Sequence, residues 1–232
     1  MNLITRTWQS SLGKKYLMAI SGCVLFGFVI GHLLGNLQIF LGPEALNRYG
    51  HFLQTTPELI WPARIVLLAL AALHIASAIA LTKQNRAARP VGYGDYKVVA
   101  ASYASRTMFM SGLIVLAFII YHLLHFTAQT PDVNFTGQDF KTLHDEQGRH
   151  DIYRMMILGY RQPLVSLFYV IGVGLLCLHL SHGVSSMFQS MGWKNKSYGA
   201  FLDKFAIVVS VIIFLGYISI PAAVLIGMFD KR

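Results

Sequence analysis

The residues best suited to chemistry in this chain are histidines that recur at a fixed spacing inside apolar segments. In two segments a Ser-Gly pair is followed by a histidine ten residues after the glycine. The first runs from Ser21-Gly22 to His32 and the second from Ser111-Gly112 to His122. Basic residues precede both segments, so each histidine lies roughly 24 Å along a helix from a basic end. Two imidazoles at one depth on two helices are able to bind one ligand between them.

Four further histidines lie in apolar segments, which brings the total there to six of the nine in the chain. They are His74, His125, His179 and His182. An ionisable side chain at membrane depth is costly and is a functional candidate by default. The alternative for any one of them is a neutral imidazole hydrogen-bonded to a neighbouring helix. Because four successive apolar segments each supply at least one histidine, the set favours a shared function.

The composition indicates an integral membrane protein. Of the 232 residues, 55% are hydrophobic and 12% are charged, and this charged share is about half that of a typical soluble domain. We expect an all-α bundle of five transmembrane helices, forming one domain over residues 1–232. The first apolar stretch is longer than a signal-peptide core, so we expect it to stay as the first span. The five apolar stretches long enough to cross are residues 16–40, 61–81, 107–128, 163–189 and 201–228.

The charge distribution predicts the orientation of the bundle. With the N-terminus inside, the inner segments hold eleven basic and two acidic residues, and the outer segments hold eight of each sign. The positive-inside rule therefore places the N-terminus in the cytoplasm of a multi-pass protein of the cell's inner (cytoplasmic) membrane. The net charge of +9 reflects this bias and does not indicate nucleic-acid binding. The basic inner loop 83–106 suits an acidic partner or anionic membrane lipid, and 129–162 is a long outer loop.

Depth in the membrane sorts the histidines into two pairs. The first and third helices run outward, so His32 and His122 lie in their outer halves. The second and fourth run inward, so His74 and His179 lie toward the inside. Two facing imidazoles suit a planar macrocycle with iron between them, whereas zinc would need four close ligands. The pattern predicts two six-coordinate b haems stacked between the first four helices.

The residues leave the choice of ligand open on two helices. His122 and His125 lie about 60° apart on one helix side, as do His179 and His182, so either member is a possible ligand. The Ser-Gly repeat favours His122, because it gives this histidine the depth of His32. Small residues on these helices would let a flat ring approach the backbone, and ordinary helix packing would also use them. They are Gly22, Gly27, Gly31, Gly112, Gly172, Gly174, Gly183 and Ala78.

Several of these segments resemble motifs of a known family. Phe28–Asn36 is similar to the first-helix haem motif of the dihaem cytochrome b anchors of type B succinate:quinone oxidoreductases, that is, succinate dehydrogenases or fumarate reductases. Leu73–Ala76 falls where the second-helix ligand of that family stands, and Tyr121–Leu123 resembles its third-helix motif. Phe168–Val173 and Leu178–Gly183 resemble the fourth. The likeness covers all five spans in order.

The resemblance implies roles for the chain and for its histidines. His74 and His179 would hold the inner, proximal haem, and His32 and His122 the outer, distal haem. The chain would anchor a flavoprotein subunit and an iron-sulfur subunit, and would pass their electrons through both haems to a quinone, menaquinone by family. It has no Rossmann fingerprint and no cluster-binding cysteines, so its own chemistry is electron transfer and quinone redox. Cys177 stands where some of these fumarate reductases carry a glutamate used as a proton route, which puts such a route in doubt.

Depth in the membrane also indicates which residues would lie near the haems and near a quinone. Asn36, His51 and Glu58 lie at outer helix ends and are candidates for quinone binding. Neighbouring Trp61 and Arg64 fit an interfacial belt better.

Inner basic and hydroxyl residues are candidate partners of haem propionates: Arg106 and Lys97, with Ser21 and Ser111. His125 and His182 are candidates to bond a propionate or a quinone, with a solvated or helix-bonded imidazole as the alternative for each.

Three other functions compete with this interpretation. A dihaem anchor of a formate dehydrogenase or hydrogenase usually has four spans and another histidine layout. A transporter would use the histidines to relay protons without haem, but the sequence shows no inverted repeat. A purely structural anchor without haem would not need four matched histidines. A colourless purified protein would favour the transporter.

Overall fold

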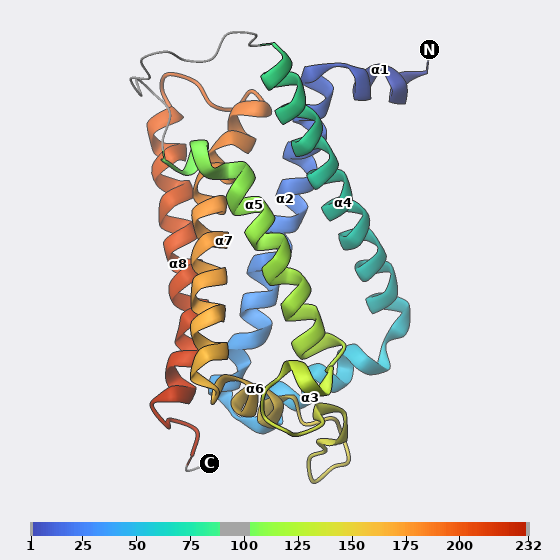
Figure 1. The fold of residues 1–232 in the computed structure, drawn as a ribbon, viewed down its shortest axis with the longest axis vertical. Coiled ribbons are helices and arrows are strands. Elements are labelled where there is room, and N and C mark those ends of the chain that lie inside the picture. The colour runs from blue at the N-terminus through green and yellow to red at the C-terminus, as the bar shows by residue number, and fades with distance from the viewer. Residues whose placement is uncertain (1, 89–102, 231–232) are drawn as a thin grey trace. The chain divides into compact units, whose positions relative to one another are not determined.

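The computed structural model describes residues 2–88 and 103–230, and helices account for nearly all of its regular structure (Figure 1). Most of the described chain lies in the eight α-helices. In chain order the elements are α1 Leu3–Gln9, α2 Ser11–Asn36, η1 Leu37–Leu41, α3 Pro43–Thr55, α4 Pro57–Ala87, α5 Tyr103–His122, the π-helical turn η2 Leu123–Thr127, η3 Pro131–Val133, η4 Phe140–Thr142, α6 Ile152–Tyr160, α7 Pro163–Ser190 and α8 Gly199–Leu225.

Five of the described helices are long and apolar enough to cross a membrane, which confirms the predicted number and the all-α class. They span Ser11–Leu41, Pro57–Ala87, Thr107–Thr127, Pro163–Ser190 and Gly199–Leu225. Two of them are much longer than their apolar stretches: α2 begins five residues earlier than predicted, and α4 ends six residues later. The added turns contain lysine, glutamine and arginine, which favour helix but lie outside a hydropathy window.

The long helices carry large apolar side chains on their exposed surfaces. Examples are Leu34, Ile65, Leu68, Leu164, Phe201 and Ile212. Soluble proteins rarely expose contiguous apolar patches of this extent, whereas lipid tails accept them. The surface therefore agrees with a multi-pass membrane protein.

Turn residues mark the helix boundaries. Gly42 has a φ of 102°, in the region that favours glycine, and Pro43 follows it as the first residue of α3. This turn separates α3 from the span that ends at Leu41. Gly192 has a φ of 77° and lies two residues after the end of α7.

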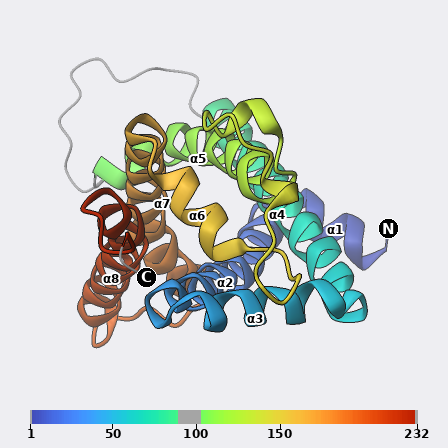
Figure 2. The same cartoon turned by 90° about the horizontal axis from the view of Figure 1, so that it is seen from below.

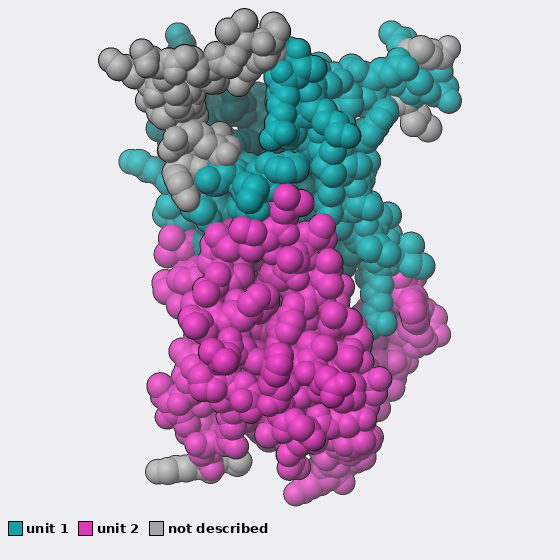
Figure 3. Space-filling view, in the orientation of Figure 1, with its two compact units in different colours: residues 1–28, 63–111, 178–210 teal, residues 29–62, 112–177, 211–232 magenta. Residues whose placement is uncertain are grey.

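The chain divides into two compact units whose boundaries fall inside long helices (Figure 3). Unit 1 contains residues 1–28, 63–111 and 178–210, and unit 2 contains residues 29–62, 112–177 and 211–232. His74 and His179 belong to unit 1, whereas His32 and His122 belong to unit 2. Each predicted histidine pair therefore lies within one unit.

The segment predicted as a long outer loop, 129–162, contains the helix α6, which lies beside α3 in unit 2 (Figure 2). The buried Asn47 of α3 joins the two: it accepts from the backbone N–H of Tyr153 at 2.9 Å and donates to Asp151 at 3.0 Å. Gly50 faces Ile152, and a Cβ at Gly50 would lie 2.0 Å from that side chain. Close packing of α3 on α6 therefore requires glycine at this position.

Arg149 ties the same segment to α3 through two carboxylates. Its guanidinium donates to Glu44 at 2.6 Å and to Asp145 at 2.8 Å. The hydrogen bond from Arg149 lowers the pKa of Glu44. Burial alone would raise the pKa of Asp145, but the guanidinium and backbone N–H of Arg149 outweigh burial and lower it. Glu44 and Asp145 in turn raise the pKa of Arg149.

Candidate functional site

In unit 2 the imidazole of His32 on α2 faces that of His122, the last residue of α5. Their ring centroids lie 5.7 Å apart, with the ring planes at 83°. Phe118 stacks on His122 at 6.2 Å, one turn earlier on the same helix. Tyr217 of α8 lies on the other side of the pair, 6.3 Å from His32 by ring centroids. Aromatic side chains from α5 and α8 thus lie beside the pair.

In unit 1 His74 of α4 faces His179 of α7. Their ring centroids lie 6.5 Å apart, with the ring planes at 63°. His182 lies one turn further along α7, and its Nε2 is 3.0 Å from Ser186 on the same helix. His179 and not His182 therefore forms the pair with His74.

Both pairs have the separation that two axial imidazole ligands need. An imidazole nitrogen binds a transition metal at about 2 Å, and the ring centroid lies about 1 Å beyond that nitrogen, so two ligands on opposite sides of one metal have centroids about 6 Å apart. The observed separations of 5.7 and 6.5 Å bracket this value.

Some glycines on the histidine-bearing helices occupy exposed or half-buried positions with open space beside the backbone. A Cβ at Gly31, next to His32, would meet nothing within 4 Å, and the same holds at Gly27 and at Gly183. At Gly22 the backbone instead comes close to the histidine, because a Cβ there would lie 3.2 Å from Cε1 of His74. Gly27, Gly31 and Gly183 thus leave open space beside their helices, whereas Gly22 lets the α2 backbone approach the His74 ring.

A hydrogen bond to a backbone carbonyl fixes the tautomer of His74 in the unit 1 pair. Nδ1 of His74 lies 3.1 Å from the carbonyl of Met18, which can only accept, so Nδ1 carries the proton. The Ser21 hydroxyl lies 3.2 Å from the same nitrogen and donates to the Leu17 carbonyl at 2.7 Å. Its oxygen therefore acts as a second acceptor for His74. Nε2 keeps its lone pair and is free to bind a metal.

His179 is held in the same way by the serine of the other Ser-Gly pair. Ser111 lies 3.3 Å from Nδ1 of His179 and donates to the Met108 carbonyl at 3.1 Å. The hydroxyl oxygen can accept from Nδ1–H, and in that tautomer Nε2 of His179 carries the lone pair that a metal needs. Depth predicts both serines near propionates, and in the structure each of them lies against a histidine.

The second histidine of the third span is separated from the pair by an aromatic cluster. His125 is fully buried in the π-helical turn, stacked on Phe126 with centroids 4.0 Å apart. Its Nδ1 lies 3.0 Å from the Tyr169 hydroxyl, which is also 3.4 Å from Nδ1 of His122. His122 and not His125 therefore faces His32. Tyr169 belongs to a segment that resembles the fourth-helix motif, but no sequence pattern indicates that its hydroxyl contacts two histidines.

The predicted quinone-binding residues occupy separate positions. Asn36 is half-buried at the end of α2, His51 is exposed on α3, and Glu58 is exposed in the first turn of α4. In the part of the chain that the structure describes, no hydrogen bond or ion pair joins these three side chains. Their role in quinone binding stays a prediction.

The structure describes only some of the residues predicted to contact haem propionates. Lys97 lies outside the described residues, and Arg106 lies in the first turn of α5. Sequence reasoning missed Lys14, a buried cation of unit 1 whose ammonium is 3.5 Å from the Gln9 carbonyl and 5.9 Å from the centre of the Trp8 ring. Its position in a basic cluster before the first apolar run gave no sign of burial.

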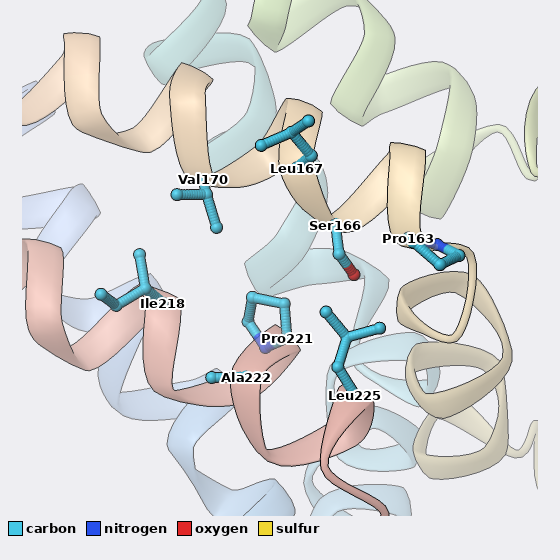
Figure 4. Close-up of a pocket in the computed structure, with 8 residues that line it drawn as sticks. All are labelled: Pro163, Ser166, Leu167, Val170, Ile218, Pro221, Ala222 and Leu225. Carbon is cyan, nitrogen blue, oxygen red and sulfur yellow. The ribbon is translucent and has the colours of Figure 1, made fainter.

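An apolar pocket of about 260 Å³ lies in unit 2 (Figure 4). Ser166 is its polar lining residue, and its hydroxyl donates to the Tyr160 carbonyl at 2.6 Å. The pocket is therefore suited to a hydrocarbon chain and not to a polar head group. The lining comes from α7 (Pro163, Ser166, Leu167 and Val170) and from α8 (Ile218, Pro221, Ala222 and Leu225).

Comparison of the chain with known proteins gives no match. No protein-family model, no curated protein and no solved structure matches the chain.

Proposed function

We propose that this chain is a membrane-anchor cytochrome b that carries two bis-histidine b haems, as the electron-transferring subunit of a succinate dehydrogenase or fumarate reductase. The observation that carries the proposal is the presence of two histidine pairs, each within one unit, at the separation of axial ligands. His74 and His179 support it further, because each has Nδ1 engaged and Nε2 available.

The two histidine pairs suit a metal ion that accepts and releases one electron. A haem bound there would supply one-electron redox chemistry. His74 would stay a neutral ligand, because the Met18 carbonyl and the Ser21 hydroxyl accept its Nδ1 proton, and Ser111 offers the same acceptor to His179. Hydrogen bonds to the ligands would be one local control of the redox potential.

The wider assignment rests on the motif resemblance and on the charge pattern of the sequence. The basic segments that we place on the cytoplasmic side would dock the flavoprotein and iron-sulfur subunits. Electrons from those subunits would reach the haem of His74 and His179 first and the haem of His32 and His122 second. A quinone, menaquinone by resemblance, would then be reduced near Asn36, His51 or Glu58.

Redox spectroscopy of the purified complex tests the proposal. We expect two b haems per chain by pyridine haemochrome assay, titrating in separate steps. Alanine at His32 or His122 should remove one signal, and alanine at His74 or His179 the other. Alanine at the exposed His51 should keep both haems.

The outcomes separate the competing functions. A preparation without haem would refute the proposal and leave the proton-relaying transporter. Two haems without succinate-dependent reduction in the assembled complex would point to the anchor of another respiratory dehydrogenase. Single-histidine variants that keep both haem signals would show that the ligands are assigned wrongly.

A further inference from the structure

The hydroxyl of Tyr169 lies between two histidine nitrogens in unit 2. It is 3.4 Å from Nδ1 of His122 and 3.0 Å from Nδ1 of His125. Tyr169 is 4% exposed and His125 is fully buried, so water does not compete for these contacts. One hydroxyl oxygen can accept from one partner and donate to the other, which allows an ordered chain of three groups.

The direction of this chain follows from the proposed function, on which the inference rests. If Nε2 of His122 binds iron, its Nδ1 carries the proton and donates to the Tyr169 oxygen. The Tyr169 hydroxyl is then free to donate to Nδ1 of His125. A phenol that donates in this way is a better acceptor, because successive hydrogen bonds polarise one another.

We propose that Tyr169 is a positioning residue for His122, and that His125 orients the Tyr169 hydroxyl. The three side chains form a hydrogen-bonded relay that fixes the tautomer, ring orientation and basicity of one haem ligand. Tyr169 touches the ligand and not the reacting iron, so it acts through His122.

The backbone conformation around His125 directs this histidine away from the His32–His122 pair. The π-helical turn starts directly after His122 and closes with the N–H of Ala128 donating to the Leu123 carbonyl at 2.7 Å. Such turns alter the direction of side chains within a helix and are frequent at functional sites.

On the far side of His125, Gly159 of α6 allows the backbone to approach the ring. A Cβ at Gly159 would lie 3.1 Å from Nε2 of His125. Nε2 is buried and, among the described residues, has no hydrogen-bond partner. No room is left for a quinone or propionate at this nitrogen, which leaves the contact with Tyr169 as the polar function of His125.

The relay should lower the redox potential of the haem bound by His32 and His122. Donation from Nδ1–H makes the imidazole a stronger electron donor, which favours ferric over ferrous iron. Loss of an outer partner typically changes metal affinity by about tenfold or more. For a one-electron couple, a tenfold change in the preference for ferric iron corresponds to about 59 mV.

The test compares two tyrosine-to-phenylalanine variants in the assembled complex. Tyr169→Phe removes the hydroxyl between the histidines. Tyr217→Phe is the matched control in the same unit, because Tyr217 lies beside His32 but donates to the Val29 carbonyl at 2.8 Å. Midpoint potentials and low-temperature EPR spectra are recorded for both haems.

We expect Tyr169→Phe to raise one midpoint potential by about 59 mV and to change the EPR signal of that haem alone. Tyr217→Phe should leave both potentials near the wild-type values. An unchanged potential in Tyr169→Phe, or an equal shift in Tyr217→Phe, would overturn the inference. A wild-type complex without haem would instead refute the proposed function.

A second variant keeps the inference testable if Tyr169→Phe does not assemble. His125→Phe leaves Tyr169 in place and removes only its acceptor. A smaller shift in the same direction is expected, and a double variant with Tyr169→Phe should show no further shift, because the two residues act in one chain. No shift in His125→Phe, or fully additive shifts, would overturn the relay.

Discussion

Replacing Ser111, the partner of His179, by alanine should weaken haem retention more than replacing Ser21, the partner of His74. With a metal on Nε2, His179 has the Ser111 hydroxyl as the acceptor for its Nδ1–H, whereas His74 has both the Ser21 hydroxyl and the Met18 carbonyl. Ser111→Ala therefore leaves a half-buried N–H without that acceptor, at a cost of about 1–3 kcal/mol, whereas a hydrogen bond that is replaced contributes only about 0.5–1.5 kcal/mol. We expect Ser111→Ala to weaken haem retention at least fivefold, and Ser21→Ala by a smaller factor.

The assay is the rate at which haem leaves the purified complex for an excess of a haem-scavenging protein, followed by absorbance. Both serines are buried and both also bond a carbonyl in their own helix, so the two variants differ chiefly in the second acceptor. The faster-leaving haem in Ser111→Ala should be the one lost from His74→Ala. Equal effects of the two alanine variants, or a larger effect at Ser21, would refute the reasoning about acceptors.

Three further predictions concern packing and the α3–α6 region. Gly172→Ala should destabilise the protein by about 1–3 kcal/mol, because its Cβ would lie 2.3 Å from the Phe118 ring; Gly174→Ala, with 3.6 Å to its nearest neighbour, is the control that should retain wild-type thermal stability in detergent. The two carboxylates on Arg149 have lowered pKa values, so their contribution is complete above the unfolded carboxyl pKa of about 4 and is lost as pH falls through the folded values. Proteolysis of segment 129–162 should therefore accelerate at acid pH, and an Arg149→Met variant with unchanged pH dependence would contradict this. Asn47→Ala leaves a buried backbone N–H of α6 without its acceptor, at about 1–3 kcal/mol, and hydrogen exchange should be faster in residues 152–160; exchange at the wild-type rate would argue against it.

The sequence was sufficient for the spans because a membrane helix is defined by a local property. Apolar runs of the required length identify the helix without knowledge of its neighbours. The ends of the helices were less accessible: the last turns of α4 contain Lys83 and Arg86, which hydropathy excludes although both residues favour helix. The α6 helix was missed because Asn47 and Tyr153, far apart in sequence, hold it against α3.

The pairing of the histidines followed from depth, and the choice within each span required side-chain geometry. Depth placed the first span with the third and the second with the fourth, the Ser-Gly repeat favoured His122, and the family resemblance favoured His179; His32 lies close to His122 and His74 to His179 in the structure. The alternative His125 lies only one turn away, so depth could not exclude it. Tyr169 looked like an ordinary apolar-core aromatic, because its hydroxyl shows a role only when the neighbouring helices are known.

The structure shows what the serine and the histidine of each Ser-Gly and histidine repeat contact, which their spacing alone did not indicate. Eleven residues separate Ser21 from His32 and Ser111 from His122, and eleven residues are close to three turns of an α-helix, so serine and histidine share a helix face. The serines contact the histidines of unit 1, and the repeat histidines form the pair of unit 2. Each repeat therefore supplies an outer partner to one pair and a candidate ligand to the other from a single face. Two helices with this face thus supply two of the four candidate ligands and a serine partner for each of the other two, which gives the repeat of this short pattern a structural reason.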